Sequence, residues 1–296
     1  MKKLTIFTVL CFLMLSNVFA QETAFTVILN KGSNSHGNGE LKPVILGETL
    51  MDNEQLVIAD GGYMALVHDE SGISLEINEE GNYSVKELIQ KVDEKSNTVL
   101  SKYGKFLMSK LNPEGEGNQN LNVTGAVERG DADYIRVFLP TVTDVYGDDL
   151  LIAWQQADEI QDYILTIKNS RDQIILQKNV TGTKYNLSFD QQPFSDLKLM
   201  IINVRARSNQ SFISKDYGIN RISEDQKQSI KNEYEHLVDV AEGNNVISKL
   251  LIASFFEENE LLGDAISYYD QALALSPDTD GFEKLYNNFL YRNQLK

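Results

Sequence analysis

Cysteine, proline and long apolar runs are scarce in this sequence of 296 residues. It contains one cysteine and five prolines. The cysteine, Cys11, lies within the first 20 residues, so residues 21–296 form no disulfide among themselves and have no thiol chemistry. Those residues also contain no apolar run that approaches the length of about 20 residues needed for a membrane-spanning helix. Their stability must therefore come from packed hydrophobic cores.

Basic residues are also in short supply. The chain has 27 lysines and arginines against 43 aspartates and glutamates, which gives a net charge of −16. A surface of this sign repels nucleic acid and anionic lipid, so we expect neither as a partner. It also favours solubility, which is the simpler explanation of the acidity.

The first 20 residues have the pattern of a secretory signal peptide. Lys2 and Lys3 are basic, residues 4–15 are almost all apolar, and Ala20 closes a Val-Phe-Ala sequence suited to signal peptidase. We therefore expect export to the periplasm of a Gram-negative bacterium, with secretion or surface association as alternatives. An uncleaved anchor, or a lipid attached at Cys11, stays open, although the residue before Cys11 is too large for the usual lipidation motif.

Residues 21–83 have the pattern of short β-strands. Apolar runs at 25–29, 44–46, 55–58 and 63–68 are separated by glycine and aspartate turns. Such spacing predicts a small antiparallel barrel or sandwich.

The turns and apolar positions of this segment resemble the FecR-like β domain of bacterial envelope proteins. The matching positions are Gly47, Leu50, Leu66, Gly72 and Leu75. The resemblance implies a binding or sensing module more than an enzyme.

Two segments without strand patterns follow. Residues 84–111 place apolar side chains at helical spacing, which predicts one or two helices packed on the β domain or, alternatively, a helix kept for a partner. Residues 112–130 are polar and glycine-rich without apolar periodicity, which predicts a linker.

Residues 131–222 return to short strands, beginning with an apolar run at 135–139. Their number and turns favour a β-sandwich. The stretch LLIAWQQADEIQDYILTIKN resembles two strands of an immunoglobulin-like or fibronectin-type module, and that resemblance implies that Trp154 is its core tryptophan.

Residues 223–296 are predicted to be helical, because Ser223 and Gln226 form a capping box ahead of a helix at 224–242. The segment 246–279 resembles a tetratricopeptide repeat. The matching positions are Ile252, Ala253 and Phe256 in its first helix, and Ala265, Tyr269, Ala272 and Pro277 in its second. Small alanines let the two helices approach, and the proline ends the second. One repeat cannot bury its faces alone, so we expect 224–242 and 282–294 to flank it.

The sequence therefore predicts a multi-domain protein of β plus α class. Its expected parts are a signal peptide (1–20), a FecR-like β domain (21–83), a helical segment (84–111), a linker (112–130), an Ig-like sandwich (131–222) and a helical repeat segment (223–296).

Residues suited to catalysis or metal binding do not gather in any motif. His36, His68 and His236 belong to different segments and lack metal-ligand spacing. Nucleophile-elbow, phosphate-loop and dinucleotide motifs are missing from the sequence. We therefore expect no catalytic, cofactor or metal site. Three acidic loops leave calcium open as an alternative, at Asp131 and Asp133, at Asp148 and Asp149, and at Asp278 and Asp280.

The leading hypothesis is a non-enzymatic envelope protein that acts in protein–protein interaction or assembly, with an envelope protein of unknown identity as its partner. A sensor module for a small ligand or glycan is the first alternative. A hydrolase with an unrecognised site is the second.

Export is the expectation that is simplest to test. A copy tagged at its C-terminus should appear in the periplasmic fraction, and its first residue should be Gln21. Cell fractionation followed by N-terminal sequencing measures both. Recovery of the uncleaved chain in the cytoplasm would contradict the prediction.

Overall fold

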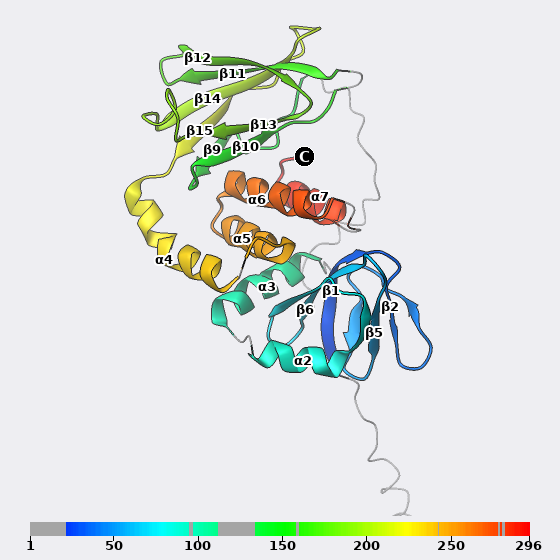
Figure 1. The fold of residues 1–296 in the computed structure, drawn as a ribbon. Coiled ribbons are helices and arrows are strands. Elements are labelled where there is room, and N and C mark those ends of the chain that lie inside the picture. Colours follow the sequence, from blue (N-terminus) through cyan, green and yellow to red (C-terminus); the bar gives the residue numbers. More distant parts are fainter. Residues whose placement is uncertain are drawn as a thin grey trace, which may run out of the picture.

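The computed structural model describes residues 22–94, 97–111, 134–157, 160–241, 243–277, 279 and 282–296. The described chain has a mixed α and β fold with four sheets and six helices (Figure 1). The expected signal peptide and linker lie outside the described residues. No described helix is both long and apolar enough to cross a membrane.

The first β module contains two four-stranded sheets and no barrel. The sheets have the strand orders β4-β1-β6-β7 and β3-β2-β5-β8. Its strands are β1 (Thr23–Lys31), β2 (Ser35–Gly37), β3 (Lys42–Pro43), β4 (Thr49–Met51), β5 (Gln55–Ile58), β6 (Tyr63–His68), β7 (Ser74–Ile77) and β8 (Gly81–Ser84). The barrel alternative is therefore wrong, because the strands stay in separate sheets. The strand expected at 44–46 is also wrong, because the chain turns there before β4.

The sheet that contains β1 and β6 is buried on both faces. In β6, Met64 and Leu66 belong to the core between the two sheets, whereas Ala65 and Val67 belong to a second core shared with the helices. Successive side chains of a strand point to opposite faces, so this alternation places the sheet between two apolar layers.

Helices α2 (Val85–Glu94) and α3 (Thr98–Leu111) cover different parts of the first module. Val85 and Leu88 of α2 belong to the core between the sheets. Tyr103 and Leu107 of α3 belong to the second core. Both helices of the segment 84–111 therefore pack on the first β module.

The second β module has one sheet of five strands, in the order β12-β11-β14-β15-β9, and one of two, β10-β13. Its strands are β9 (Val142–Val145), β10 (Asp149–Ala153), β11 (Asp162–Asn169), β12 (Ile174–Thr181), β13 (Lys184–Ser188), β14 (Leu199–Ala206) and β15 (Tyr217–Arg221). Trp154 is buried and packs edge-on against Tyr163, with ring centroids 5.4 Å apart. The strand expected at 135–139 is wrong, because that run makes only one isolated bridge, from Val137 to Trp154.

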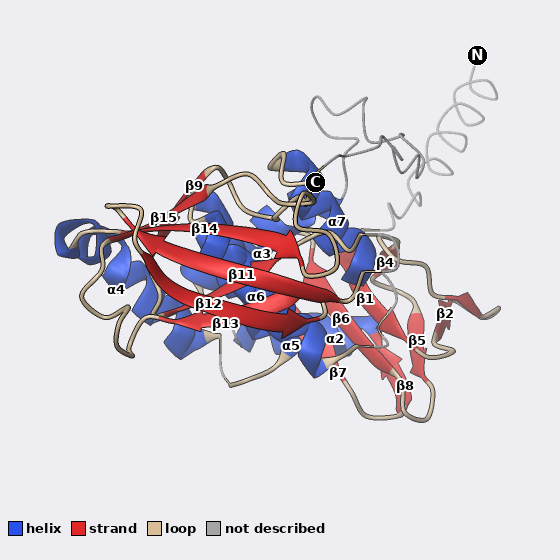
Figure 2. Cartoon of the chain, turned by 90° about the horizontal axis from the view of Figure 1, so that it is seen from above, coloured by secondary structure: helices blue, strands red, loops and turns tan. Residues whose placement is uncertain are grey.

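The C-terminal helices lie between the two β modules (Figure 1). They are α4 (Glu224–Val240), α5 (Val246–Glu258), α6 (Leu262–Leu275) and α7 (Phe282–Arg292). Seen from above, the five-stranded sheet lies across the helices (Figure 2). Ser223 and Gln226 form the predicted capping box at the start of α4.

Helix α5 is buried around its whole circumference by the rest of the chain. Eleven of its residues are buried, and α3, α4, α6 and β7 all contact it. A buried ion pair also joins its end to α7: Arg292 donates from Nε to Glu257 Oε1 at 2.5 Å and from Nη2 to Oε2 at 2.6 Å. The face of this hairpin that could have formed a partner groove is therefore covered by the chain's own elements.

Two glycines set the contact between α3 and the first β module. A Cβ atom on Gly104 would lie 1.8 Å from the carbonyl oxygen of Gly72, and Gly72 adopts a φ of +75° that favours glycine. Helix and turn therefore touch backbone to backbone.

A Gly104→Ala substitution should lower stability, although alanine is the better helix former by about 1 kcal/mol. The added methyl group must push α3 away from the turn, and overpacking of this kind costs about 1–3 kcal/mol. Urea denaturation measures the change. The exposed Ser109→Ala in the same helix is the control and should not destabilise the protein. Equal or greater stability of Gly104→Ala would contradict the contact.

Candidate functional site

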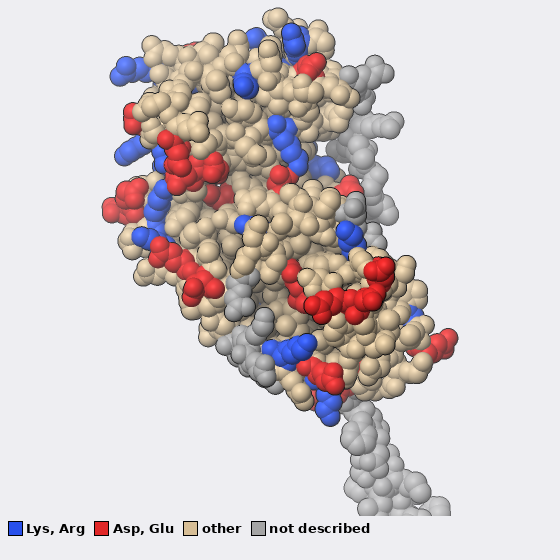
Figure 3. All heavy atoms as spheres, viewed as in Figure 1, with Lys and Arg blue, Asp and Glu red and all other residues tan. Residues whose placement is uncertain are grey.

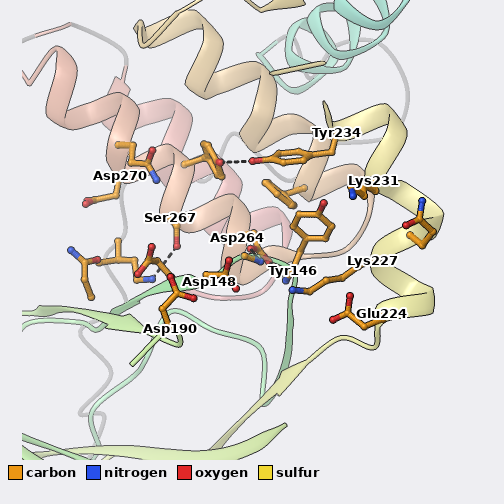
Figure 4. Close-up of a pocket in the computed structure, with 18 residues that line it drawn as sticks. Tyr146, Asp148, Asp190, Glu224, Lys227, Lys231, Tyr234, Asp264, Ser267 and Asp270 are labelled. Carbon is orange, nitrogen blue, oxygen red and sulfur yellow. Dashed lines mark hydrogen bonds between the residues drawn. The ribbon is translucent and has the colours of Figure 1, made fainter. Parts of the chain in front are cut away.

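A cleft of about 800 Å³ lies where the second β module meets α4 and α6. Its walls come from chain segments far apart in sequence: the turn between β9 and β10, the first half of α4, and one side of α6. In the close-up, Asp264 and Ser267 of α6 lie opposite Lys227 and Lys231 of α4 (Figure 4).

Asp264 holds the turn between β9 and β10 against α6. Its Oδ2 accepts the N–H of Tyr146 at 2.9 Å, and its Oδ1 accepts the N–H of Gly147 at 2.8 Å. The residue is only 2% exposed. This burial raises the pKa of Asp264 to about 6, although the N–H donors and Lys227 counteract the rise. Both carboxyl oxygens are thus already used within the chain.

Ser267, one turn further along α6, holds strand β10 against the helix by a hydrogen bond. Its Oγ accepts the N–H of Leu151 at 2.9 Å and donates to the carbonyl of Gly263 at 3.1 Å. The hydroxyl proton is therefore engaged in the helix. Side chains of α6 dock the second β module by binding its backbone.

Aromatic side chains form the inner wall of the cleft. Tyr146, Tyr234 and Phe256 pack on one another, with the Tyr146 ring centre 5.2 Å from that of Tyr234 and 5.7 Å from that of Phe256, and Phe256 stacks on Tyr268 at 5.4 Å. The hydroxyl groups of Tyr234 and Tyr268 share a hydrogen bond of 2.9 Å. Burial raises the pKa of Tyr234 well above its usual range, so the phenol stays neutral. The rings pack on one another in the wall of the cleft.

Charged groups of both signs surround the cleft opening. Asp148 lies 3.4 Å from Arg221, and Asp270 pairs with Lys184. Lys227 lies 5.7 Å from the ring centre of Tyr146. Figure 3 shows acidic and basic side chains intermixed along the side where α4 meets the second β module. The opening therefore suits a polar surface rather than an ion of one sign.

The residues predicted from the repeat and FecR-like patterns lie mostly in the cores. Ile252, Ala253, Ala265, Tyr269 and Ala272 are buried, and Pro277 follows the end of α6. Leu50, Leu66 and Leu75 are buried in the first module, while Gly47 and Gly72 adopt positive φ values in turns. Of all these residues, Phe256 alone lines the cleft.

The acidic loops considered for calcium do not form a ligand set in the described part of the chain, where no group of acidic, histidine or cysteine side chains is arranged to hold a metal. Asp148 and Asp149 line the cleft, and Asp148 faces Arg221. Asp131, Asp133, Asp278 and Asp280 lie outside the described residues.

The three histidines lie in three different elements, His36 in β2, His68 in β6 and His236 in α4. His36 is buried between two carboxylates, with Nε2 3.0 Å from Glu48 and Nδ1 3.0 Å from Glu54. Burial raises the pKa of Glu48, but hydrogen bonds from Lys42 and the N–H of Ile45 outweigh it and hold that pKa below its ordinary value. This group joins the hairpin of β2 and β3 to β4 and β5.

Sequence patterns did not point to Asp264, Tyr146, Tyr234 or Tyr268 as one group. Asp264 reads as an ordinary acidic residue in the first turn of a helix, which is a common place for one. Its role depends on a β turn more than 110 residues earlier in the chain, as the Tyr146 and Gly147 hydrogen bonds show.

The burial of Asp264 should make stability depend on pH. Its pKa is raised from 3.8 to about 6 on folding, so its contribution to stability is full below pH 4 and is lost as the pH rises through 6. The free energy of unfolding of the wild type, relative to Asp264→Asn, should fall by about 2 kcal/mol between pH 4 and pH 7. Urea denaturation at several pH values measures it. Asp270→Asn on the same helix is the control, and a pH-independent difference for Asp264→Asn would contradict the prediction.

A scan against protein-family models found no match to this chain, and a search of curated proteins found no relative. The FecR-like, Ig-like and repeat resemblances therefore rest on the quoted residues and remain predictions.

Proposed function

We propose that this chain is an exported, non-enzymatic protein of the bacterial envelope that acts through protein–protein contact. The observation that carries the proposal is the state of Asp264, the deeply buried carboxyl of the cleft. A general acid or base needs a lone pair or proton directed at its substrate. Both oxygens of Asp264 instead accept backbone N–H groups of the β9–β10 turn.

The rest of the cleft supports binding to a protein surface. Tyr146, Tyr234 and Tyr268 line the cleft together with charged and amide side chains, and protein interfaces commonly combine aromatic residues with a polar rim. The FecR-like, Ig-like and repeat resemblances also belong to modules of interaction. Since α5 is covered within the chain, we place the partner at the cleft rather than at a groove of the repeat.

A glycan or small-ligand sensor is the alternative. The amides of Asn186 and Gln271 would suit a sugar. Sugar sites, however, use exposed aromatic faces, and the ring of Tyr268 is stacked on Phe256 and lies 5.4 Å from Lys249. The packing therefore favours the protein partner.

Site-specific photo-crosslinking in the source cells tests the proposal. A benzoylphenylalanine at Gln271, which lines the cleft and is exposed, should give adducts of discrete mass with another protein. The control position is Gln177, which is exposed on β12 of the opposite part of the module. Identical adducts at both positions, or none at Gln271, would count against the cleft. Thermal shifts with glycans but not with proteins would favour the alternative.

A further inference from the structure

Strand β7 has an open edge. It is the last strand of the sheet β4-β1-β6-β7 and pairs only with β6. The N–H of His68 donates to the carbonyl of Ile73 at 2.8 Å, which fixes the alternation of the antiparallel ladder that follows. Backbone groups of Leu75 and Ile77 therefore face β6, and those of Ser74 and Glu76 face outward. Within the described residues, these outward groups have no hydrogen-bond partner.

A hollow lies beside each face of this edge. One, of about 730 Å³, is lined by Ser74 and Glu76 on one side and by the end of α4 and the start of α5 on the other. The second, of about 220 Å³, is lined by Leu75 and Ile77 together with Tyr83 and Leu88. An added strand would direct alternate side chains to opposite faces, and so into the two hollows in turn.

The two hollows differ in charge and polarity. The larger contains Glu76 and Asp239 but, among the described residues, no lysine or arginine. It also faces the C-terminal end of α4, where the helix dipole is negative and the last turn has no basic residue. Glu76 Oε1 already accepts the N–H of Ile247 at the start of α5 at 2.7 Å and the hydroxyl of Tyr63 at 2.9 Å. The attraction for a cation therefore depends mainly on Asp239 and the end of α4. The larger hollow is suited to a cation.

The smaller hollow is suited to an aliphatic side chain. Leu75 and Ile77 are 8% and 6% exposed, and Leu88 of α2 lies beside them. Its charged lining residues are Glu76, which it shares with the larger hollow, Glu79 and Lys91. Lys91 opposes one of the two carboxylates, so this side is less acidic than the larger hollow.

We propose that β7 binds an extended segment of a partner protein by strand addition, with lysine or arginine side chains in the larger hollow and aliphatic side chains in the smaller. Backbone hydrogen bonds to Ser74 and Glu76 would supply the affinity, and the two hollows the sequence preference. The inference rests on the proposed function, since it names the chemistry of a protein partner, but it concerns a surface distinct from the cleft.

Fluorescence anisotropy with labelled octapeptides tests the inference. The probe alternates lysine and valine. One control has the same composition in two blocks of four, and another alternates glutamate and valine. The alternating lysine peptide should bind at least 10-fold more tightly than either control. Equal binding of the block peptide would show attraction by net charge alone and would overturn the proposal.

Matched variants locate the binding. Ser74→Pro removes an outward N–H and leaves the bonds of Leu75 and Ile77 to β6, as proline on an edge strand allows. It should weaken binding at least 10-fold, whereas Ser74→Ala should bind as the wild type does. Asp239→Lys, which leaves the strand unchanged, should also weaken binding. Circular dichroism and thermal melting confirm that each variant is folded.

Hydrogen exchange gives a readout that does not depend on any variant. The amides of Ser74 and Glu76 should become protected when the lysine–valine peptide binds the wild type, and unchanged exchange at both would overturn the proposal. Crosslinks at Gln271 without peptide binding would refute strand addition alone. Peptide binding without those crosslinks would refute the cleft and leave strand addition standing.

Discussion

The burial of α5 on all sides is the constraint on which the rest of the structure depends. A helix that is apolar around its circumference must be surrounded by other elements. Here α3, α4, α6 and β7 surround it, and they come from both halves of the chain. One continuous core therefore runs from Ala65 in the first β module, through Phe255, to Trp154 in the second. The two β modules are joined through the helices rather than through each other's edges.

Local features could be predicted from the sequence, and the arrangement in space could not. Ser223 and Gln226 predict a helix cap because their hydrogen bonds span only three residues and therefore depend on local sequence. The burial of Ala253 and Ala272 follows from the spacing of small residues in a helical hairpin. The same pattern says only that α5 is covered, not that α3 and β7 cover it. The separation of the first module into two sheets depends on long-range register, which strand-forming residues do not specify.

The candidate sites could not be predicted from the sequence for the same reason. The cleft arises where a β turn, the start of α4 and one side of α6 meet, and no short sequence window contains more than one of its walls. The edge of β7 looks like an ordinary alternating strand in sequence. Its open side becomes visible only when the order of strands in the sheet is known. The two candidate surfaces, the cleft and the edge of β7, form where segments distant in sequence meet.

The doubly buried sheet has a consequence for synthesis. Residues 23–84 are synthesised before the C-terminal helices, but the partner layer for Ala65 and Val67 includes helices from the last third of the chain. Until those helices are made, only α3 can cover that face of the first module, and part of its apolar surface has no partner. The fold is therefore completed only when the C-terminal helices are present. A chain interrupted before α5 would expose an apolar face of this sheet, and such faces promote aggregation with other chains.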